Sequence, residues 1–147
     1  MRRILVALRL AMMLGIATVG TGQATTPIVS EHEVDWQAAP VRLLMVEQRG
    51  CVYCARWDQE IGPGYAASEE GRAAPLLRVD IDGPWPDGLA IGPRPVITPT
   101  FILLDHGIEV GRIDGYVGEA YFYPVLRETF SDLDRSRGPG AGTAVID

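Results

Sequence analysis

"EQRGCVYCARW", residues 47–57, contains both cysteines of this 147-residue chain, Cys51 and Cys54, separated by two residues. Cysteines at this spacing can form a structural disulfide, half of a metal site or a redox centre. The segments on either side of the pair and the composition of the chain decide which of these chemistries is favoured.

A strand and a helix are predicted on the two sides of Gly50. VRLLMVE, residues 41–47, is a compact apolar run that indicates a buried strand. After Gly50, a helix is expected to begin at the cysteine pair. Four of its side chains recur at three- and four-residue steps, so they share one face and are expected to turn to the core: Tyr53, Cys54, Trp57 and Ile61. Cys51, at the N-terminal edge, stays outside.

The next segments predict a parallel strand and a long loop. GPG, residues 62–64, interrupts the helix because proline removes a backbone donor. Residues 65–70 are expected to resume it briefly before Gly71 closes it. PLLRVDID, residues 75–82, is a second strand, parallel to the first because a helical segment connects them. Residues 83–99 contain five prolines and predict a structured loop with one helical turn.

The remaining elements complete the expected fold. TFILL and IEVGRI flank the turn sequence DHG and predict a β-hairpin over residues 100–113. A terminal helix is expected over residues 119–135. Near the N-terminus, Ser30 followed by Glu33 is a capping-box pattern that would start a short helix running towards Ala39. This order predicts an α/β fold, in which a mixed four-stranded sheet is flanked by helices on both faces.

The first 24 residues have the layout of a secretory signal peptide. Three arginines, at positions 2, 3 and 9, precede an apolar run that ends at Val19, and small residues lead to Ala24, after which cleavage is expected. The apolar run is roughly half as long as a membrane-spanning helix. We therefore expect a signal peptide over residues 1–24, one domain over residues 25–137 and a mobile tail over residues 138–147.

Charge excludes several classes of function. The formal net charge is −6, and removal of residues 1–24, which hold three arginines and no acidic residue, changes it to −9. A domain this acidic has no electrostatic footprint for nucleic acid and is repelled by anionic membranes. The chain also contains no lysine, so no amine is available for a Schiff base.

The structural and metal alternatives explain the cysteine pair less well. In the chain-entropy model, closing a loop of about four residues stabilises the fold by only ~2 kcal/mol. A closed zinc site needs four ligands, and besides the thiols the chain offers only His32 and His106, neither of which is paired with another donor. A copper or zinc carrier that uses the two sulfurs alone remains an alternative.

A redox function fits the position of the pair better. A sulfur at the start of a helix lies beside unpaired backbone N–H groups and the positive end of the helix dipole, which favour the thiolate of Cys51. Cys54, one turn later on the inward face, is shielded but can attack a mixed disulfide formed at Cys51. Arg49 and Arg56 would favour the thiolate further, whereas Glu47 would oppose it.

The same segments resemble the thioredoxin superfamily over residues 41–134: a strand, GCVYC opening a helix, a second parallel strand, and ITPT before a hairpin. The resemblance implies a thioredoxin fold and a thiol-disulfide oxidoreductase that needs no dissociable cofactor. It also implies that Pro99 is cis and packs against the cysteine pair, and that backbone groups of Thr98 bind an extended substrate strand. Val52 and Tyr53, between the cysteines, complete the expected substrate-binding residues.

Longer segments are similar to periplasmic thioredoxin-like proteins of the SoxS type, which are encoded with bacterial sulfur-oxidation systems: VEQRGCVYCARWDQEIGPGY, EGRAAPLLRVDID and ITPTFILLDHGIEVGRIDGYVGE. The similarity implies a periplasmic, monomeric reductase in which Cys51 attacks a partner disulfide or capped thiol and Cys54 resolves the adduct. The implied partners are a cysteine-bearing carrier of the SoxYZ type and a membrane electron donor of the CcdA or DsbD type. The tyrosine-containing motif leaves glutaredoxin-like or isomerase-like exchange as an alternative.

Two positions depart from ordinary thioredoxins. Gly50 stands where thioredoxins carry tryptophan, which leaves the rim of the site more open. Met45 stands where the family carries a buried acid six positions before the first cysteine, so the group that takes the proton from Cys54 is not defined by the resemblance. Glu47 is a candidate for that role, directly or through water.

Overall fold

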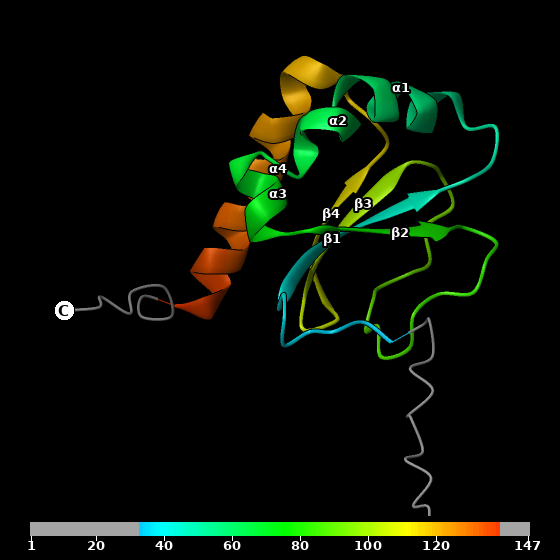
Figure 1. Ribbon diagram of the computed structural model, residues 1–147. Helices are drawn as coiled ribbons and strands as arrows, with labels where there is room; N and C mark the ends of the chain where they lie inside the picture. Colours follow the sequence, from blue (N-terminus) through cyan, green and yellow to red (C-terminus); the bar gives the residue numbers. More distant parts are fainter. Residues whose placement is uncertain (1–32, 139–147) are drawn as a thin grey trace, which may run out of the picture.

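The computed structural model describes residues 33–138, and the mixed four-stranded sheet at its centre is confirmed (Figure 1). The strand order is β2-β1-β3-β4, in which β1 and β2 are parallel and the other two pairs are antiparallel. The strands are β1 (Val41–Glu47), β2 (Leu76–Asp80), β3 (Thr100–Asp105) and β4 (Ile108–Asp114). The helices are α1 (Val52–Glu60), α2 (Gly62–Tyr65), α3 (Glu69–Ala73) and α4 (Glu119–Arg137).

Local sequence explains the predicted hairpin and its turn. β3 and β4 are joined at His106 and Gly107, whose φ angles are 50° and 84°. A two-residue type I′ turn matches the twist of a β-hairpin and needs a positive φ at both of its central residues. Glycine adopts a positive φ without steric cost. The predicted signal peptide and all of the predicted tail except Gly138 lie outside the described residues.

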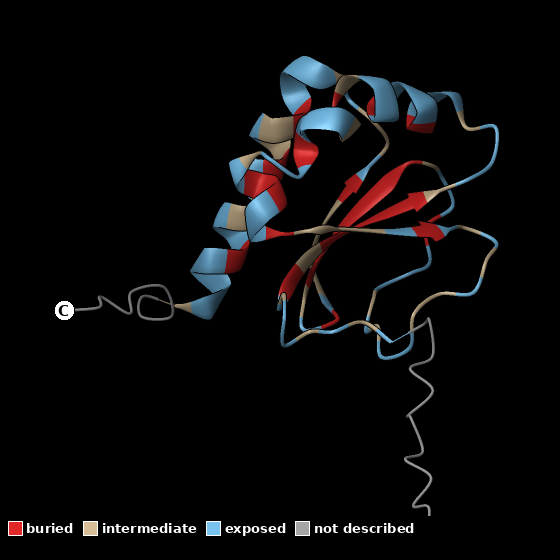
Figure 2. Ribbon diagram, in the orientation of Figure 1, coloured by how far each residue is buried: buried red, intermediate tan, exposed pale blue. Residues whose placement is uncertain are grey.

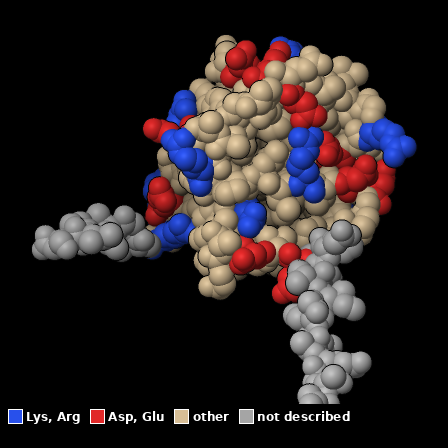
Figure 3. Space-filling view, viewed as in Figure 1, with Lys and Arg blue, Asp and Glu red and all other residues tan. Residues whose placement is uncertain are grey.

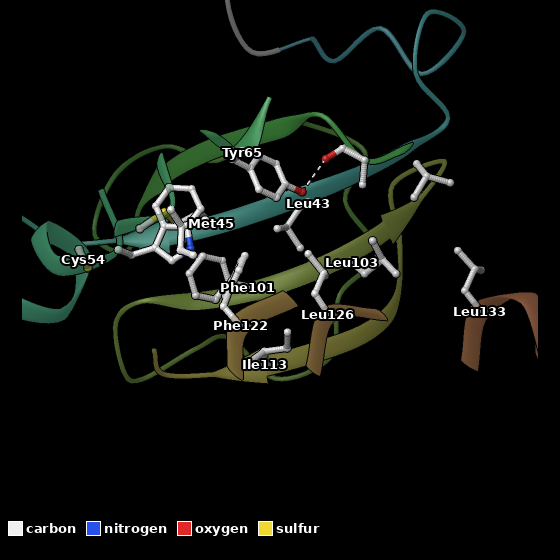
Figure 4. Close-up of a cluster of buried hydrophobic side chains, with 14 residues drawn as sticks. Leu43, Met45, Cys54, Tyr65, Phe101, Leu103, Ile113, Phe122, Leu126 and Leu133 are labelled. Carbon is white, nitrogen blue, oxygen red and sulfur yellow. Dashed lines mark hydrogen bonds between the residues drawn. The ribbon is translucent and has the colours of Figure 1, made fainter. Parts of the chain in front are cut away.

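Two hydrophobic clusters lie on opposite faces of the sheet, because successive side chains of a strand point to opposite faces. The larger cluster joins one face of β1 and β3 to the helices, as the close-up of Figure 4 shows around Met45, Cys54 and Phe101. Three fully buried aromatic rings form its centre, with ring centroids 5.0 to 5.8 Å apart: Trp57, Phe101 and Phe122. Buried residues accordingly line the strands and the inner sides of the helices (Figure 2).

The opposite face differs from the expectation of helices on both sides. Among the described residues, the side chains that cover this second cluster come from turns and loops: Trp36, Ile81, Trp85, Leu89 and Ile91. The prolines of residues 83–99 prevent a helix there, so the loop covers the sheet with single apolar side chains. In place of the one helical turn expected within this loop, Asp87 and Gly88 form a turn that is not helical, because Gly88 has a φ of 79°.

The short helix expected to end at Ala39 is also wrong over its described part. Within residues 33–39, only residues 36–38 form a turn, at which the carboxylate of Asp35 accepts the N–H groups of Gln37 and Ala38 at 2.9 and 3.0 Å. An aspartate that binds the backbone two residues ahead favours a turn over a helix, and Pro40 then prevents continuation. Ser30 lies outside the described residues.

Gly71 does not close a helix as predicted; it lies inside α3. A Cβ atom at this position would lie 1.8 Å from the carbonyl oxygen of Tyr65. The glycine is therefore needed because the backbone of the preceding turn passes against it, and α2 and α3 form two short helices in place of one resumed helix. Within residues 33–138, no helix is both long and apolar enough to cross a membrane.

Candidate active site

The two cysteines form a disulfide at the N-terminus of α1, with their Cα atoms 5.3 Å apart. Cys51 is the N-cap residue, and its Sγ accepts the backbone N–H of Cys54 at 3.1 Å. Cys51 is half-buried, whereas Cys54 is only 4% exposed and packs in the larger cluster. The pair thus has the placement that the sequence predicts, with one sulfur at the helix start and the other beneath it.

Pro99 lies at the same edge of the sheet as the cysteine pair. The register of β1 and β3 places Val46 opposite Thr100, so the residues just before Thr100 face the end of β1 that leads to Cys51. The Thr98–Pro99 peptide bond is cis. Pro99 is buried and its carbonyl accepts the N–H of Gly115 at 2.8 Å, while Thr98 is half-buried.

Apolar side chains are exposed on the segments that carry the cysteines and Pro99. Val52 is 76% and Tyr53 57% exposed, and Val96, in the loop before Pro99, is 90% exposed. The expectation that Tyr53 faces the core is therefore wrong. Tyr53 and Cys54 are successive residues of α1, so their side chains point about 100° apart around the helix axis. Cys54 faces the core, and the core beside it is filled by the ring of Trp57, which packs against Phe101 and Phe122.

An ionic cluster beside the cysteines includes two residues that the sequence did not single out. Arg78 of β2 donates from Nε to Oε1 of Glu47 at 3.1 Å and from Nη1 to Oδ1 of Asp58 at 2.8 Å. A further pair joins its Nη2 to Oε2 of Glu47. The guanidinium also lies over the ring of Trp57, 5.9 Å from its centroid. The hydrogen bonds to Glu47 and then Asp58 raise the pKa of Arg78 above its ordinary value.

This cluster and the cysteines share one groove. Its cavity volume is about 530 Å³, and the residues that line it include Glu47, Cys51, Cys54, Arg56 and Asp58. Arg78 could be placed only once the strand register was known, because it pairs with Met45 of β1 and parallel partners lie on the same face of the sheet. The sequence could not show that Asp58 of the helix would reach the same guanidinium.

A second ionic cluster joins α1 to the segment after β4. Arg56 donates to Glu60 at 2.8 Å, and the Tyr116 hydroxyl donates to the other carboxylate oxygen of Glu60 at 2.7 Å. The hydrogen bonds from Arg56 and then Tyr116 lower the pKa of Glu60, and partial burial together with the bond to Glu60 raises the pKa of Tyr116. Arg56 is thus paired with Glu60, while Arg49 is exposed.

His106, one of the two histidines considered as metal ligands, lies away from the cysteines. His106 occupies the hairpin turn, where its Nδ1 lies 2.7 Å from Oδ1 of Asp105, and His32 lies outside the described residues. Within the part of the chain that the structure describes, no three His, Cys, Asp or Glu side chains form a group that could hold a metal ion.

Comparison with solved structures found thioredoxins. The chain is 47% identical to the periplasmic thioredoxin SoxS from Paracoccus pantotrophus in its reduced form, with a TM-score of 0.62, over 63% of this chain and 98% of that one. A Fasciola hepatica thioredoxin matches with 17% identity and a TM-score of 0.42, over 63% and 85% of the two chains. A Malassezia sympodialis thioredoxin matches with 16% identity and a TM-score of 0.40, over 61% and 75%. No protein-family model matches the sequence, and no curated protein gave a significant match.

The match to the Paracoccus protein spans nearly the whole of that chain and confirms the predicted thioredoxin fold. Together with the Cys51–Cys54 disulfide at the start of α1, it identifies a thiol-disulfide oxidoreductase. The chain therefore belongs to the thioredoxin superfamily.

Proposed function

We propose that the protein is a periplasmic reductase of protein disulfides or capped thiols. The observation that carries the proposal is the difference between the two sulfurs. The Sγ of Cys51 accepts an N–H at the start of α1 and is partly accessible, whereas Cys54 is buried one turn later. In the reduced protein, the N–H groups and the helix dipole at this point favour the thiolate of Cys51.

The reaction then follows thiol-disulfide exchange. The Cys51 thiolate attacks one sulfur of the partner disulfide, a mixed disulfide forms, and the other partner sulfur leaves with the electron pair. Cys54 next attacks the Sγ of Cys51, and the partner sulfur leaves as a thiolate that takes up a proton. Two electrons pass to the partner, and the protein is left with the Cys51–Cys54 disulfide present in the structure.

The proposed substrate-binding residues lie on the two segments that carry the cysteines and Pro99. Thr98, half-buried before Pro99, would offer backbone groups to an extended segment of the partner, as a strand edge does. The exposed side chains of Val52 and Tyr53 would give that segment apolar contact area. Acidic and basic side chains are interspersed on the face drawn in Figure 3.

The compartment and partners are proposed from the sequence and the similarity to the Paracoccus protein. That protein is a periplasmic thioredoxin, and residues 1–24 of this chain have the layout of a signal peptide. We propose that the monomeric protein keeps a cysteine-bearing carrier of the SoxYZ type reduced. A membrane donor of the CcdA or DsbD type would return it to the dithiol form, without a dissociable cofactor.

A trapping experiment tests this function. The Cys54→Ser variant lacks the resolving thiol, so it should hold the partner in a mixed disulfide through Cys51. Periplasmic extract is passed over the immobilised variant, and proteins released by dithiothreitol are identified by mass spectrometry. The proposal predicts one or a few cysteine-bearing proteins that are absent from a parallel Cys51→Ser column. Equal recovery from both columns would count against it.

A further inference from the structure

Release of the partner depends on an unexplained proton transfer. The Sγ of Cys54 becomes an effective nucleophile only when its thiol proton is removed. The Met45 position of β1 contributes no acceptor, because this side chain is fully buried and apolar. Of the residues that line the groove with Cys54, the side chains with carboxylates are Glu47 and Asp58.

Arg78 holds both carboxylates at this groove. It reaches Glu47, at the end of β1, through Nε and Nη2, and Asp58 of α1 through Nη1 at 2.8 Å and Nη2 at 3.2 Å. Two carboxylates thus share one guanidinium. A proton added to either carboxylate leaves Arg78 with the other as an ionised partner, so the arginine is not left without a counter-ion.

The two carboxylates are not equivalent. The side chain of Glu47 is 30% exposed, and that of Asp58 is 43% exposed. Glu47 is also anchored at the strand end, where its carbonyl accepts the N–H of Ile81 at 2.8 Å. The more shielded carboxylate, on a residue whose backbone is fixed in the sheet, suits proton transfer from a buried thiol, directly or across one water in the groove.

We propose that Glu47 accepts the proton of Cys54 when the mixed disulfide is resolved, and that Arg78 and Asp58 position Glu47 for this transfer. This role rests on the proposed function. As the Cys54 sulfur attacks Sγ of Cys51, its proton passes to the Glu47 carboxylate and the partner leaves as a thiolate. Glu47 then returns the proton to solvent or to the departing sulfur.

Other charged groups near the pair do not offer the same route. Arg56 also lines the groove, but it donates to Glu60 and has no proton-accepting atom. Arg49 is exposed on the loop before Cys51 and likewise cannot accept a proton. Glu60 is bound by Arg56 and by the hydroxyl of Tyr116 and does not line this groove.

The two chemical steps can be separated with a chromogenic aromatic disulfide, dithiobis(nitrobenzoate), in a stopped-flow instrument. Reduced protein releases one coloured thiolate when Cys51 attacks and a second when Cys54 resolves the adduct. Excess reagent makes the first release fast, and the second is identified by a rate that does not depend on reagent concentration. The Glu47→Gln variant should slow the second release at neutral pH by about 10-fold or more and leave the first within about twofold.

The pH profile separates proton transfer from a structural or purely electrostatic effect. The deficit of Glu47→Gln should shrink above about pH 8.5, where thiols ionise without assistance. A fixed negative charge would instead disfavour the Cys54 thiolate, so its removal would speed the second release. A faster or unchanged second release at neutral pH would therefore overturn the proposal.

Matched variants make the assignment specific. Glu128→Gln makes the same chemical change at an exposed position of α4 and should leave both releases unchanged. Glu47→Asp keeps a carboxylate and should recover part of the rate, and this comparison still holds if Glu47→Gln proves unstable. A larger deficit in Asp58→Asn than in Glu47→Gln would contradict the assignment to Glu47. Loss of the first release in the unmodified protein would instead refute the proposed function.

Discussion

The hydroxyl of Tyr116 lies 2.7 Å from Oε2 of Glu60, although the two residues are 56 positions apart in the chain. The bond ties α1, which begins at the cysteine pair, to the segment after β4. The same segment is bonded to Pro99, because the N–H of Gly115 donates to the carbonyl of Pro99 at 2.8 Å. The bond thus connects the helix of the cysteines with the segment beside Pro99.

Removal of the Tyr116 hydroxyl tests this connection. We expect Tyr116→Phe to lower the Tm by a few degrees, because a hydrogen bond to an ionised carboxylate is lost. Thermal unfolding followed by circular dichroism measures the change. Tyr121→Phe is the control, since that side chain is 65% exposed and should be nearly neutral. Equal melting temperatures for Tyr116→Phe and the unmodified protein would show that the tie does not stabilise the fold.

Gly71 should tolerate no side chain. Gly71→Ala would place a Cβ atom 1.8 Å from the carbonyl oxygen of Tyr65, so the backbone between α2 and α3 must move. We expect a loss of about 2–4 kcal/mol in the free energy of unfolding, measured by urea denaturation. Gly64→Ala in α2 is the matched control, because no atom lies within 4 Å of its added Cβ. Similar stabilities of the two variants would contradict the close approach at Gly71.

Tyr53 should matter for protein partners and not for small disulfides. Tyr53→Ser removes an exposed aromatic ring next to Cys54 and leaves both sulfurs in place. We expect kcat/KM for a protein disulfide such as insulin to fall by about threefold to tenfold, since lost apolar contact weakens docking. The rate with dithiobis(nitrobenzoate) should stay unchanged. Ile108→Ser, at the hairpin and 57% exposed, controls for lost surface hydrophobicity, and an equal fall in that variant would argue against a docking role for Tyr53.

Acid should destabilise the fold in part through Glu109. The hydrogen bond from Arg112, reinforced by the N–H of Gly92, holds the pKa of Glu109 below its ordinary value of 4.5. A lowered folded pKa means that this contribution to stability is fully present above about pH 4.5 and is lost as the pH falls through the folded value. Glu109→Gln should therefore be less stable at neutral pH and lose less stability on acidification. Urea denaturation across a pH series decides this, and parallel pH profiles would refute it.

Local patterns were sufficient for the strands and for the place of the cysteines. Apolar runs defined β1 and β3, the DHG turn defined the hairpin, and both cysteines lie where helix periodicity placed them. These features depend on neighbouring residues in the chain, so a single sequence contains the information.

Features that depend on several elements could not be predicted. The bonds of Arg78 to Glu47 and Asp58 join β2, β1 and α1, and they require the register and the angle between sheet and helix. The cover of the second sheet face by Trp36 and Trp85 likewise depends on how two loops fold back on the sheet. Tyr53 was misplaced because helix spacing alone does not define where the core ends.

The most direct test of the account is the order in which the two thiols react. Reduced protein at neutral pH is treated with limiting iodoacetamide, and the modified cysteine is identified by peptide mass spectrometry. The geometry predicts that Cys51 is alkylated first and that Cys54, at 4% exposure, is protected until the protein is unfolded. Alkylation of Cys54 before Cys51, or protection of both thiols, would contradict the roles given to the two sulfurs.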